Sequence, residues 1–112
     1  MYIGTNVLKY FTASADRITG PTLSANQWYH IAISRSTGST RLFVNGTQSG
    51  STYADSNNYG TTAPFALGTY WNNGTPSSAS TLSGYVSDLR ITKGYARYTA
   101  NFTAPTAPVR LK

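Results

Sequence analysis

Cysteine and glutamate are both absent from this sequence, and aspartate occurs only at Asp16, Asp55 and Asp88. Without cysteine the chain has neither disulfide bonds nor thiolate ligands for zinc. Long surface helices usually carry many glutamate and lysine residues, so the shortage of acidic residues argues against a helical fold. Serine, threonine, glycine and asparagine fill much of the remaining sequence, and this composition favours a β-sheet protein.

Long apolar runs are also missing. No segment approaches the ~20 consecutive apolar residues of a membrane-spanning helix, so no membrane span is expected. Residues 1–6 lack the basic region and apolar stretch of a signal peptide. The 112 residues are enough for one domain with a modest core, and too few for two.

Positive charge is in excess, but it is scattered. Nine basic residues give a formal net charge of +6. They are Lys9, Arg17, Arg35, Arg41, Arg90, Lys93, Arg97, Arg110 and Lys112. A nucleic-acid site needs a basic stripe or patch that follows the phosphates, so a nucleic-acid partner is not expected here. The charge favours acidic partners in general, such as a sulfated or uronic polysaccharide or another acidic surface polymer.

Turn signals recur about every eight to twelve residues, the spacing typical of a β-sandwich or barrel. The expected strands are Tyr2–Gly4, Val7–Thr12, Arg17–Thr19, Trp28–Arg35, Arg41–Val44, Thr47–Tyr53, Phe65–Thr69 and Gly84–Thr92. Asn45-Gly46 is the clearest hairpin signal, because a type I′ turn needs positive φ at both central positions. Apolar residues change face within the last strand, which predicts a β-bulge near Ser87-Asp88.

The segments between these strands carry other structural signals. Gly20-Pro21 is expected to break the chain. Two polar segments, Ala54–Ala63 and Tyr70–Thr81, are expected to be loops. Ala96–Tyr98 is expected to form one helical turn, and the proline-containing residues 101–112 an extended tail along the body of the domain.

Four segments, in order, carry a resemblance to a known family. Leu23–Ala32 reads L-S-A-N-Q-W-Y-H-I-A, and Arg41–Gly46 follows with R-L-F-V-N-G. Phe65–Gly68 reads F-A-L-G, and Leu82–Ile91 reads L-S-G-Y-V-S-D-L-R-I. Together with the closing residues 92–103, they resemble the laminin G-like domains of the concanavalin A-like lectin/glucanase superfamily, in the version found in phage and bacterial surface proteins.

The resemblance implies an all-β fold, a concanavalin A-like (jelly-roll) antiparallel β-sandwich that comprises residues 1–112 as one domain. Full domains of this family carry further strands before the segment that resembles Tyr2–Thr12, so the sandwich is expected to lack N-terminal strands. Missing strands would expose sheet edges and core. Either the domain is a minimised sandwich or a neighbouring chain covers the gap. The second alternative is favoured, and it predicts a homo-oligomer or docking on a larger viral or surface assembly.

Catalytic residues are not expected. Glycoside hydrolases generally place two carboxylates across the scissile bond, whereas the three aspartates here are widely spaced in the sequence. Asp88 is interpreted as structural, either as an ion-pair partner of Arg90 or Arg97 or as an acceptor for loop amides. His30, the only histidine, has no nucleophile-elbow motif to work with.

Metal ligands are equally scarce. Some laminin G-like relatives bind calcium through loop aspartates, and Asp16 and Asp55, helped by Asn57 or Asn58, are the residues that correspond in type. Calcium takes about six to eight oxygen ligands, and these residues are not clustered in the sequence. Asp16 and Asp55 are therefore interpreted as turn residues, and no metal or other cofactor is expected.

Aromatic residues supply the candidate binding site. Tyr70 and Trp71 lie in the longest predicted loop, beside asparagines, so the loop combines flat apolar faces for a sugar ring with amides for its hydroxyl groups. The candidate ligand-binding residues are Tyr70, Trp71, Asn72, Asn73 and, more weakly, Tyr59. As the alternative, Trp71 covers an open sheet edge or packs on a neighbouring subunit. Trp28 begins the strongest predicted strand and is assigned to the core.

Two functions are compatible with these features. The first is a non-enzymatic adhesion module, lectin-like and carbohydrate-binding, on a phage or bacterial surface. The second is a virion structural protein, such as a capsid decoration or tail-associated subunit, whose main partner is protein. Both place the chain on a virion or an extracellular surface.

Overall fold

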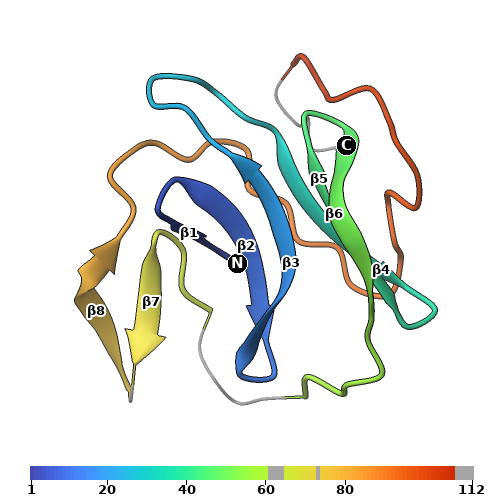
Figure 1. The fold of residues 1–112 in the computed structure, drawn as a ribbon, viewed down its shortest axis with the longest axis horizontal. Coiled ribbons are helices and arrows are strands. Elements are labelled where there is room, and N and C mark those ends of the chain that lie inside the picture. Colours follow the sequence, from blue (N-terminus) through green and yellow to red (C-terminus); the bar gives the residue numbers. More distant parts are fainter. Residues whose placement is uncertain (61–64, 73, 108–112) are drawn as a thin grey trace. The chain divides into compact units, whose positions relative to one another are not determined.

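The computed structural model describes residues 1–60, 65–72 and 74–107, and there it contains antiparallel strands and no helix (Figure 1). The strands are β1 (Tyr2–Gly4), β2 (Val7–Thr12), β3 (Ala15–Thr22), β4 (Ile31–Ser36), β5 (Ser39–Val44), β6 (Thr47–Ala54), β7 (Thr69–Asn72) and β8 (Thr75–Thr81). This part of the chain therefore offers no helix that could cross a membrane. The chain divides into two compact units: the first unit comprises Met1–Ser56 and Thr92–Lys112, and the second unit comprises Asn57–Ile91.

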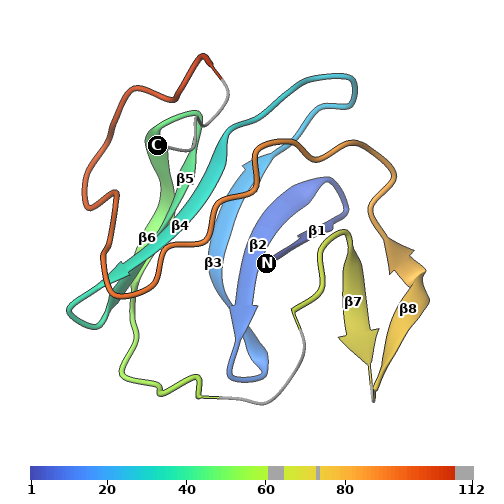
Figure 2. The same ribbon diagram turned by 180° about the vertical axis from the view of Figure 1, so that it is seen from behind.

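The first unit contains two three-stranded sheets, with strand orders β1-β2-β3 and β4-β5-β6 (Figures 1 and 2). Two-residue turns join consecutive strands within each sheet, and all their central residues have positive φ. Between β5 and β6 these residues are Asn45 (φ 51°) and Gly46 (φ 83°). Positive φ at both positions matches the twist of the flanking strands, so the hairpin predicted at Asn45-Gly46 is confirmed.

Strand β3 is longer than predicted. It extends through Gly20-Pro21, where a break was expected, and ends at Thr22. Because β3 lies at the edge of its sheet, the missing backbone N–H of Pro21 need not remove a hydrogen bond between two strands. The predicted strand Arg17–Thr19 is thus only the middle of β3.

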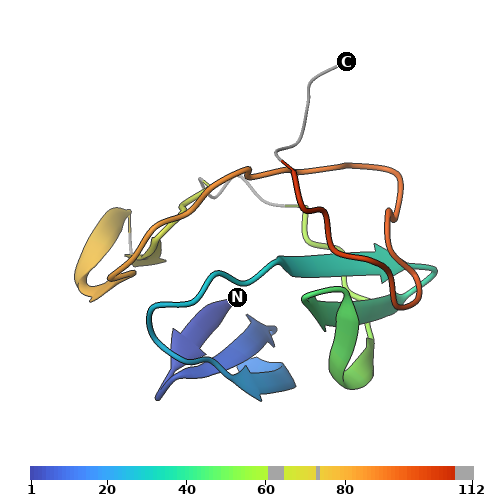
Figure 3. The ribbon, with the colours of Figure 1, turned by 90° about the horizontal axis from the view of Figure 1, so that it is seen from above.

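The two sheets of the first unit are neighbours, as the view from above shows (Figure 3). They approach closely where β3 meets β6: a Cβ atom at Gly50 would lie 2.5 Å from the carbonyl oxygen of Thr19. The core therefore depends on a glycine at position 50. It is formed by Leu8, Ile18, Leu42 and Val44, with Tyr10, Leu23, Tyr29, Ile31 and Tyr53 packed around it.

The other face of β5 is also covered. Leu42 and Val44 belong to the core, so Phe43 between them points to the opposite face. There it is fully buried and packs edge-on against Phe102, with ring centroids 5.5 Å apart, and against Tyr98, at 6.4 Å. Tyr98 and Phe102 stack on each other at 3.5 Å. We call residues 98–104, which supply this cover, the C-terminal strap.

Two hydrogen bonds, one between backbone groups and one to a side chain, fix the C-terminal strap to the β5–β6 hairpin. Phe102 N donates to the carbonyl oxygen of Gly46 (2.9 Å), and Gln48 N donates to the Asn101 side-chain oxygen (2.9 Å). A Cβ atom at Gly46 would overlap the Phe102 carbonyl group. Residues 101–107 run without helix or strand, in line with an extended tail, while residues 108–112 of the predicted tail lie outside the described residues.

The prediction that Trp28 is a core residue is wrong. Its side chain is 70% exposed, and the strand predicted from Trp28 begins only at Ile31. A turn at Asn26 (φ 59°) shapes residues 23–30 as a loop, together with the Tyr29 hydroxyl, which accepts a hydrogen bond from Ser24 N and donates one to Gln27 Oε1. Tyr29, rather than Trp28, packs against the core.

The second unit contains a single hairpin, formed by β7 and β8. None of its described side chains is buried. Its exposed apolar residues are Tyr59, Phe65, Leu67, Tyr70, Leu82, Tyr85, Val86, Leu89 and Ile91. A two-stranded hairpin is only marginally stable in water, so this unit gains little stability from packing within itself.

Several predicted elements around this hairpin are wrong. Phe65–Gly68 is not a strand, and β7 begins at Thr69. Gly84–Thr92 contains no strand either, because these residues pair with no other strand and Asp88 has positive φ (53°). The bulge expected at Ser87-Asp88 therefore has no ladder to interrupt. Ala96–Tyr98 forms no helical turn, since Tyr98 is held in the C-terminal strap.

Candidate binding site

The candidate site lies on the β7–β8 hairpin, and the prediction of a loop over Tyr70–Thr81 is wrong. Cα partners across the hairpin are Thr69 with Thr81, Trp71 with Pro76, and Asn72 with Thr75. The Thr69 hydroxyl donates to the Ser77 carbonyl oxygen (3.0 Å). Threonine favours strands, and Asn73-Gly74 is a hairpin dipeptide like the one at 45–46, so the sequence carried a signal for this turn.

Strand β7 carries three of the five predicted ligand-binding residues. Tyr70 exposes 60% of its side chain. Trp71 and Asn72 follow it on the strand, where the structure describes the backbone but not these two side chains. Asn73 lies outside the described residues. Tyr70, Trp71 and Asn72 are therefore consecutive on one strand, in a hairpin whose residues 69–81 include no charged side chain.

Tyr59 lies before the hairpin, in an irregular segment of the second unit. Asn57 Nδ2 donates a hydrogen bond to its hydroxyl (3.3 Å), and the side-chain oxygen of Asn58 accepts one from Gly60 N (3.2 Å). Asn57 and Asn58 thus shape this segment locally. Residues 61–63 of the predicted loop Ala54–Ala63 lie outside the described residues, and Ala54 belongs to β6.

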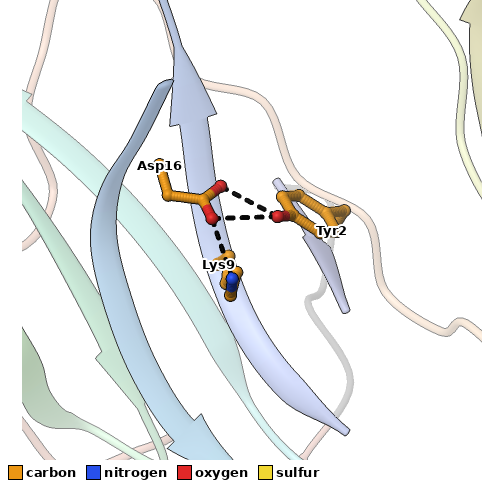
Figure 4. Close-up of polar contacts among 3 residues, drawn as sticks. All are labelled: Tyr2, Lys9 and Asp16. Atoms are coloured by element: carbon orange, nitrogen blue, oxygen red, sulfur yellow. Dashed lines mark hydrogen bonds and ion pairs between the residues drawn. The ribbon is translucent and has the colours of Figure 1, made fainter. Parts of the chain in front are cut away.

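Asp16, one of the predicted turn residues, lies on β3 and binds two side chains (Figure 4). Lys9 Nζ donates to it at 2.8 Å, and the Tyr2 hydroxyl lies 2.9 and 3.0 Å from its two oxygens. The hydrogen bond from Lys9, and then that from Tyr2, lowers the pKa of the Asp16 carboxyl. The same hydrogen bond raises the pKa of Lys9. The cluster joins β1, β2 and β3 across the sheet.

This cluster predicts a loss of stability in acid. The pKa of Asp16 is lower in the folded state than in the unfolded state, so the unfolded state binds a proton more readily as the pH falls. The contribution of Asp16 to the stability of the folded state is therefore present above about pH 4 and is lost as the pH falls through the lowered pKa. We expect Asp16→Asn to weaken the acid dependence of the urea midpoint. Asp88→Asn is the control, because Asp88 accepts only a 3.3 Å bond from the Ser87 hydroxyl among the described residues. An unchanged acid profile in Asp16→Asn would contradict this account.

Asp55 is buried, which the interpretation as a turn residue did not anticipate. The Thr40 hydroxyl donates to its carboxylate (3.0 Å), and Arg35 Nε lies 3.6 Å away. The backbone of Asp55 is fixed as well, because its N–H donates a hydrogen bond to the Gly38 carbonyl oxygen (2.6 Å). Burial keeps this carboxylate from a ligand, and its role is to tie β4, β5 and the end of β6 together.

The remaining predicted polar residues have local roles. Asp88 and Arg90 belong to the same unit and make no ion pair in the part of the chain that the structure describes, so that part of the prediction is wrong, while a pair with Arg97 of the first unit stays a prediction. These three residues are all exposed, where water screens their charges. His30 packs edge-on against Phe102 (5.5 Å) and Tyr98 (6.3 Å), and its buried Nδ1 has no hydrogen-bond partner among the described residues.

The described residues contain no group of three or more histidine, cysteine or carboxylate side chains that could hold a metal ion. Of the three aspartates, Asp16 lies in the first unit within an ion pair, Asp55 is buried, and Asp88 lies in the second unit. The exposed groups that the described residues offer to a ligand are therefore mainly aromatic, amide and hydroxyl groups.

Comparison with known proteins identifies the family. The model of a laminin G-type family, described as the concanavalin A-like lectin/glucanases superfamily, matches residues 3–97. No curated protein and no solved structure matches the chain. Domains of this laminin G-type family are generally non-catalytic and act as carbohydrate- or protein-binding modules. The all-β antiparallel fold agrees with the match, so the predicted fold class is confirmed. The chain belongs to the concanavalin A-like lectin/glucanases superfamily.

Proposed function

We propose that this chain is a non-enzymatic adhesion module that binds carbohydrate through the β7–β8 hairpin. The observation that carries the proposal is the exposure of Tyr70 on β7. An exposed aromatic side chain in water offers its flat apolar face to the C–H face of a sugar ring. Carbohydrate sites combine such faces with a few polar groups that fix orientation, and residues 69–81 of this hairpin include serine, threonine and asparagine near Tyr70 in the sequence.

The charge of the chain supports a particular setting for this module. The first unit carries the whole excess of positive charge, since the second unit contains one acidic and one basic residue, Asp88 and Arg90. The net positive charge of the first unit raises the local concentration of acidic polymers, while the uncharged hairpin recognises individual sugars. We place the module on a virion or bacterial surface, where polymers that combine neutral and acidic sugars are common ligands.

Substitution on the hairpin tests the proposal. We expect Tyr70→Ala to weaken retention on immobilised bacterial cell-wall polysaccharide by at least roughly tenfold, or about 1.4 kcal/mol, because the exposed ring that stacks on a sugar is removed. Glycan arrays read at low and high salt separate stacking, which persists in salt, from charge attraction, which weakens.

Tyr85→Ala is the matched control. Tyr85 is 88% exposed and lies in the second unit but outside the hairpin, so its removal is expected to leave retention unchanged. If the wild-type chain binds no glycan at any salt concentration, the proposal is wrong. Equal losses in Tyr70→Ala and Tyr85→Ala would indicate unspecific adsorption to aromatic side chains.

A second candidate function is structural, with a protein partner. It is favoured by the second unit, where apolar side chains such as Tyr85, Leu89 and Ile91 are exposed and no described side chain is buried. Contiguous exposed apolar surface commonly marks a protein interface. Light scattering on the samples used for glycan binding separates the two functions: a concentration-dependent mass with no glycan binding favours a virion subunit or homo-oligomer.

A further inference from the structure

An exposed tryptophan lies on the first unit. Trp28 occupies the loop of residues 23–30, between β3 and β4, and 70% of its side chain is exposed. Single apolar residues at a surface are common and need no explanation by themselves. Trp28 differs because of the loop that carries it, which is held in one conformation and lined by uncharged polar side chains.

Both ends of this loop are anchored to hairpin turns of the first unit. At one end, Leu23 N donates to the carbonyl oxygen of Asn6 (2.7 Å). At the other end, His30 and Asn45 are joined twice: His30 N donates to the Asn45 side-chain oxygen (2.9 Å), and Asn45 N donates to the His30 carbonyl oxygen (2.8 Å). The loop therefore begins and ends at fixed points.

Tyr29 holds the middle of the loop. Its ring packs against the core, while its hydroxyl accepts a hydrogen bond from Ser24 N (2.9 Å) and donates one to Gln27 Oε1 (3.1 Å). The residue beside Trp28 is thus fixed at both its apolar and its polar end. A binding surface that is already ordered loses less conformational entropy when a ligand binds.

The chemistry of the loop is that of a neutral polar ligand. Residues 23–30 contain no aspartate, glutamate, lysine or arginine. Asn26, Gln27 and Trp28 are consecutive and exposed. Because Gln27 Oε1 already accepts a hydrogen bond from Tyr29, its Nε2 group remains to donate to a ligand, and the Asn26 amide can both donate and accept.

We propose that the loop of residues 23–30 is a second carbohydrate subsite, in which Trp28 stacks on a neutral pyranose and the amides of Gln27 and Asn26 bind its hydroxyl groups. It lies in the first unit and does not depend on the β7–β8 hairpin. The platform is open, so it takes one ring within a longer saccharide rather than enclosing a free monosaccharide. The absence of charged groups in the loop makes this binding insensitive to ionic strength.

The two tryptophans of the chain allow each site to be read separately. In Trp71→Phe the only indole is that of Trp28, and in Trp28→Phe it is that of Trp71. The probes are four neutral linear hexasaccharides, built from glucose, mannose, galactose or N-acetylglucosamine. We expect at least one of them to produce a saturable change in Trp28 emission in the first variant. The same titration of the second variant reports only on the hairpin, so failure of one site is distinguishable from failure of the other.

Substitutions in the loop complete the test. We expect Trp28→Ala, in the Trp71→Phe background, to reduce binding of the responding hexasaccharide, measured by calorimetry, at least roughly tenfold, and Gln27→Ala to reduce it by less. Val86→Ala, also exposed but in the second unit, is the matched control. An unchanged near-ultraviolet circular dichroism signal from tyrosine in Trp28→Ala verifies the fold, since Trp28 is not part of the core.

Two results would overturn the proposal. The first is a Trp28 emission that none of the four hexasaccharides changes. The second is a Trp28→Ala variant that binds saccharide normally but lowers the mass measured by light scattering, because Trp28 would then be a contact between proteins.

Discussion

Phe43→Ala is expected to lower the free energy of unfolding by about 3–5 kcal/mol, the range for truncation of a fully buried aromatic side chain. Phe43 lies on the central strand β5, and the rings of Tyr98 and Phe102 cover it. Truncation removes apolar area and leaves a cavity that the strap fills only in part. Urea denaturation, monitored through tyrosine fluorescence, measures the change in the free energy of unfolding. Small domains are stable by only about 5–15 kcal/mol, so partial unfolding at room temperature would also agree.

Ile33→Ala on the neighbouring strand β4 is the control for this experiment. Ile33 is 37% exposed, so its truncation is expected to cost less than about 1 kcal/mol. A double-mutant cycle of Phe43→Ala and Phe102→Ala would isolate the coupling between the two rings. A loss in Phe43→Ala no larger than that in Ile33→Ala would mean that the C-terminal strap does not cover β5 in solution.

Gly46→Ala is expected to destabilise the first unit through two separate effects. Alanine at a φ of +83° costs about 1–2 kcal/mol. In addition, its Cβ atom would lie 3.0 Å from the Phe102 carbonyl carbon and 3.2 Å from Ala104 N, so the C-terminal strap must move. Overpacking of this kind typically adds about 1–3 kcal/mol. Urea denaturation gives the total.

Gly94→Ala separates these two effects. Gly94 has the same φ of +83°, but a Cβ atom there would meet nothing within 4 Å. We therefore expect Gly94→Ala to cost only the backbone strain, and Gly46→Ala to exceed it by more than about 1 kcal/mol. Limited proteolysis should cut after Arg97 faster in Gly46→Ala, since the strap is displaced. Equal stabilities of the two variants would show that the strap does not pack on the turn.

Local turn chemistry made part of the fold predictable. Strands β1 and β2 and the β5–β6 hairpin were predicted within a few residues, because Asn45-Gly46 and the alternation of apolar residues act over short distances. The Gly84–Thr92 segment shows the opposite case. Its apolar pattern is that of a strand, but a strand also requires a partner, and no described strand pairs with it.

The sequence predicted residue types of the candidate site, but not the secondary structure that carries them. Tyr70 was expected to be accessible and it is, yet it lies on a strand of a hairpin rather than in a loop. Trp28 was misassigned because position in a motif does not say which of two adjacent aromatic residues turns inward. Tyr29 is the residue that turns inward, and its hydroxyl forms hydrogen bonds with Ser24 and Gln27. The buried role of Asp55 likewise depends on Thr40 and Arg35, which are distant in sequence.

The C-terminal strap has a mechanical consequence. Tension applied to the chain beyond the strap reaches the first unit through the Phe102–Gly46 hydrogen bond, the bond from Gln48 to Asn101 and the stacked rings of Tyr98 and Phe102. These contacts would detach one after another, as in peeling, before the load arrives at β5. If the chain is pulled from this end, the strap would thus come away before the hairpin turns of the first unit open.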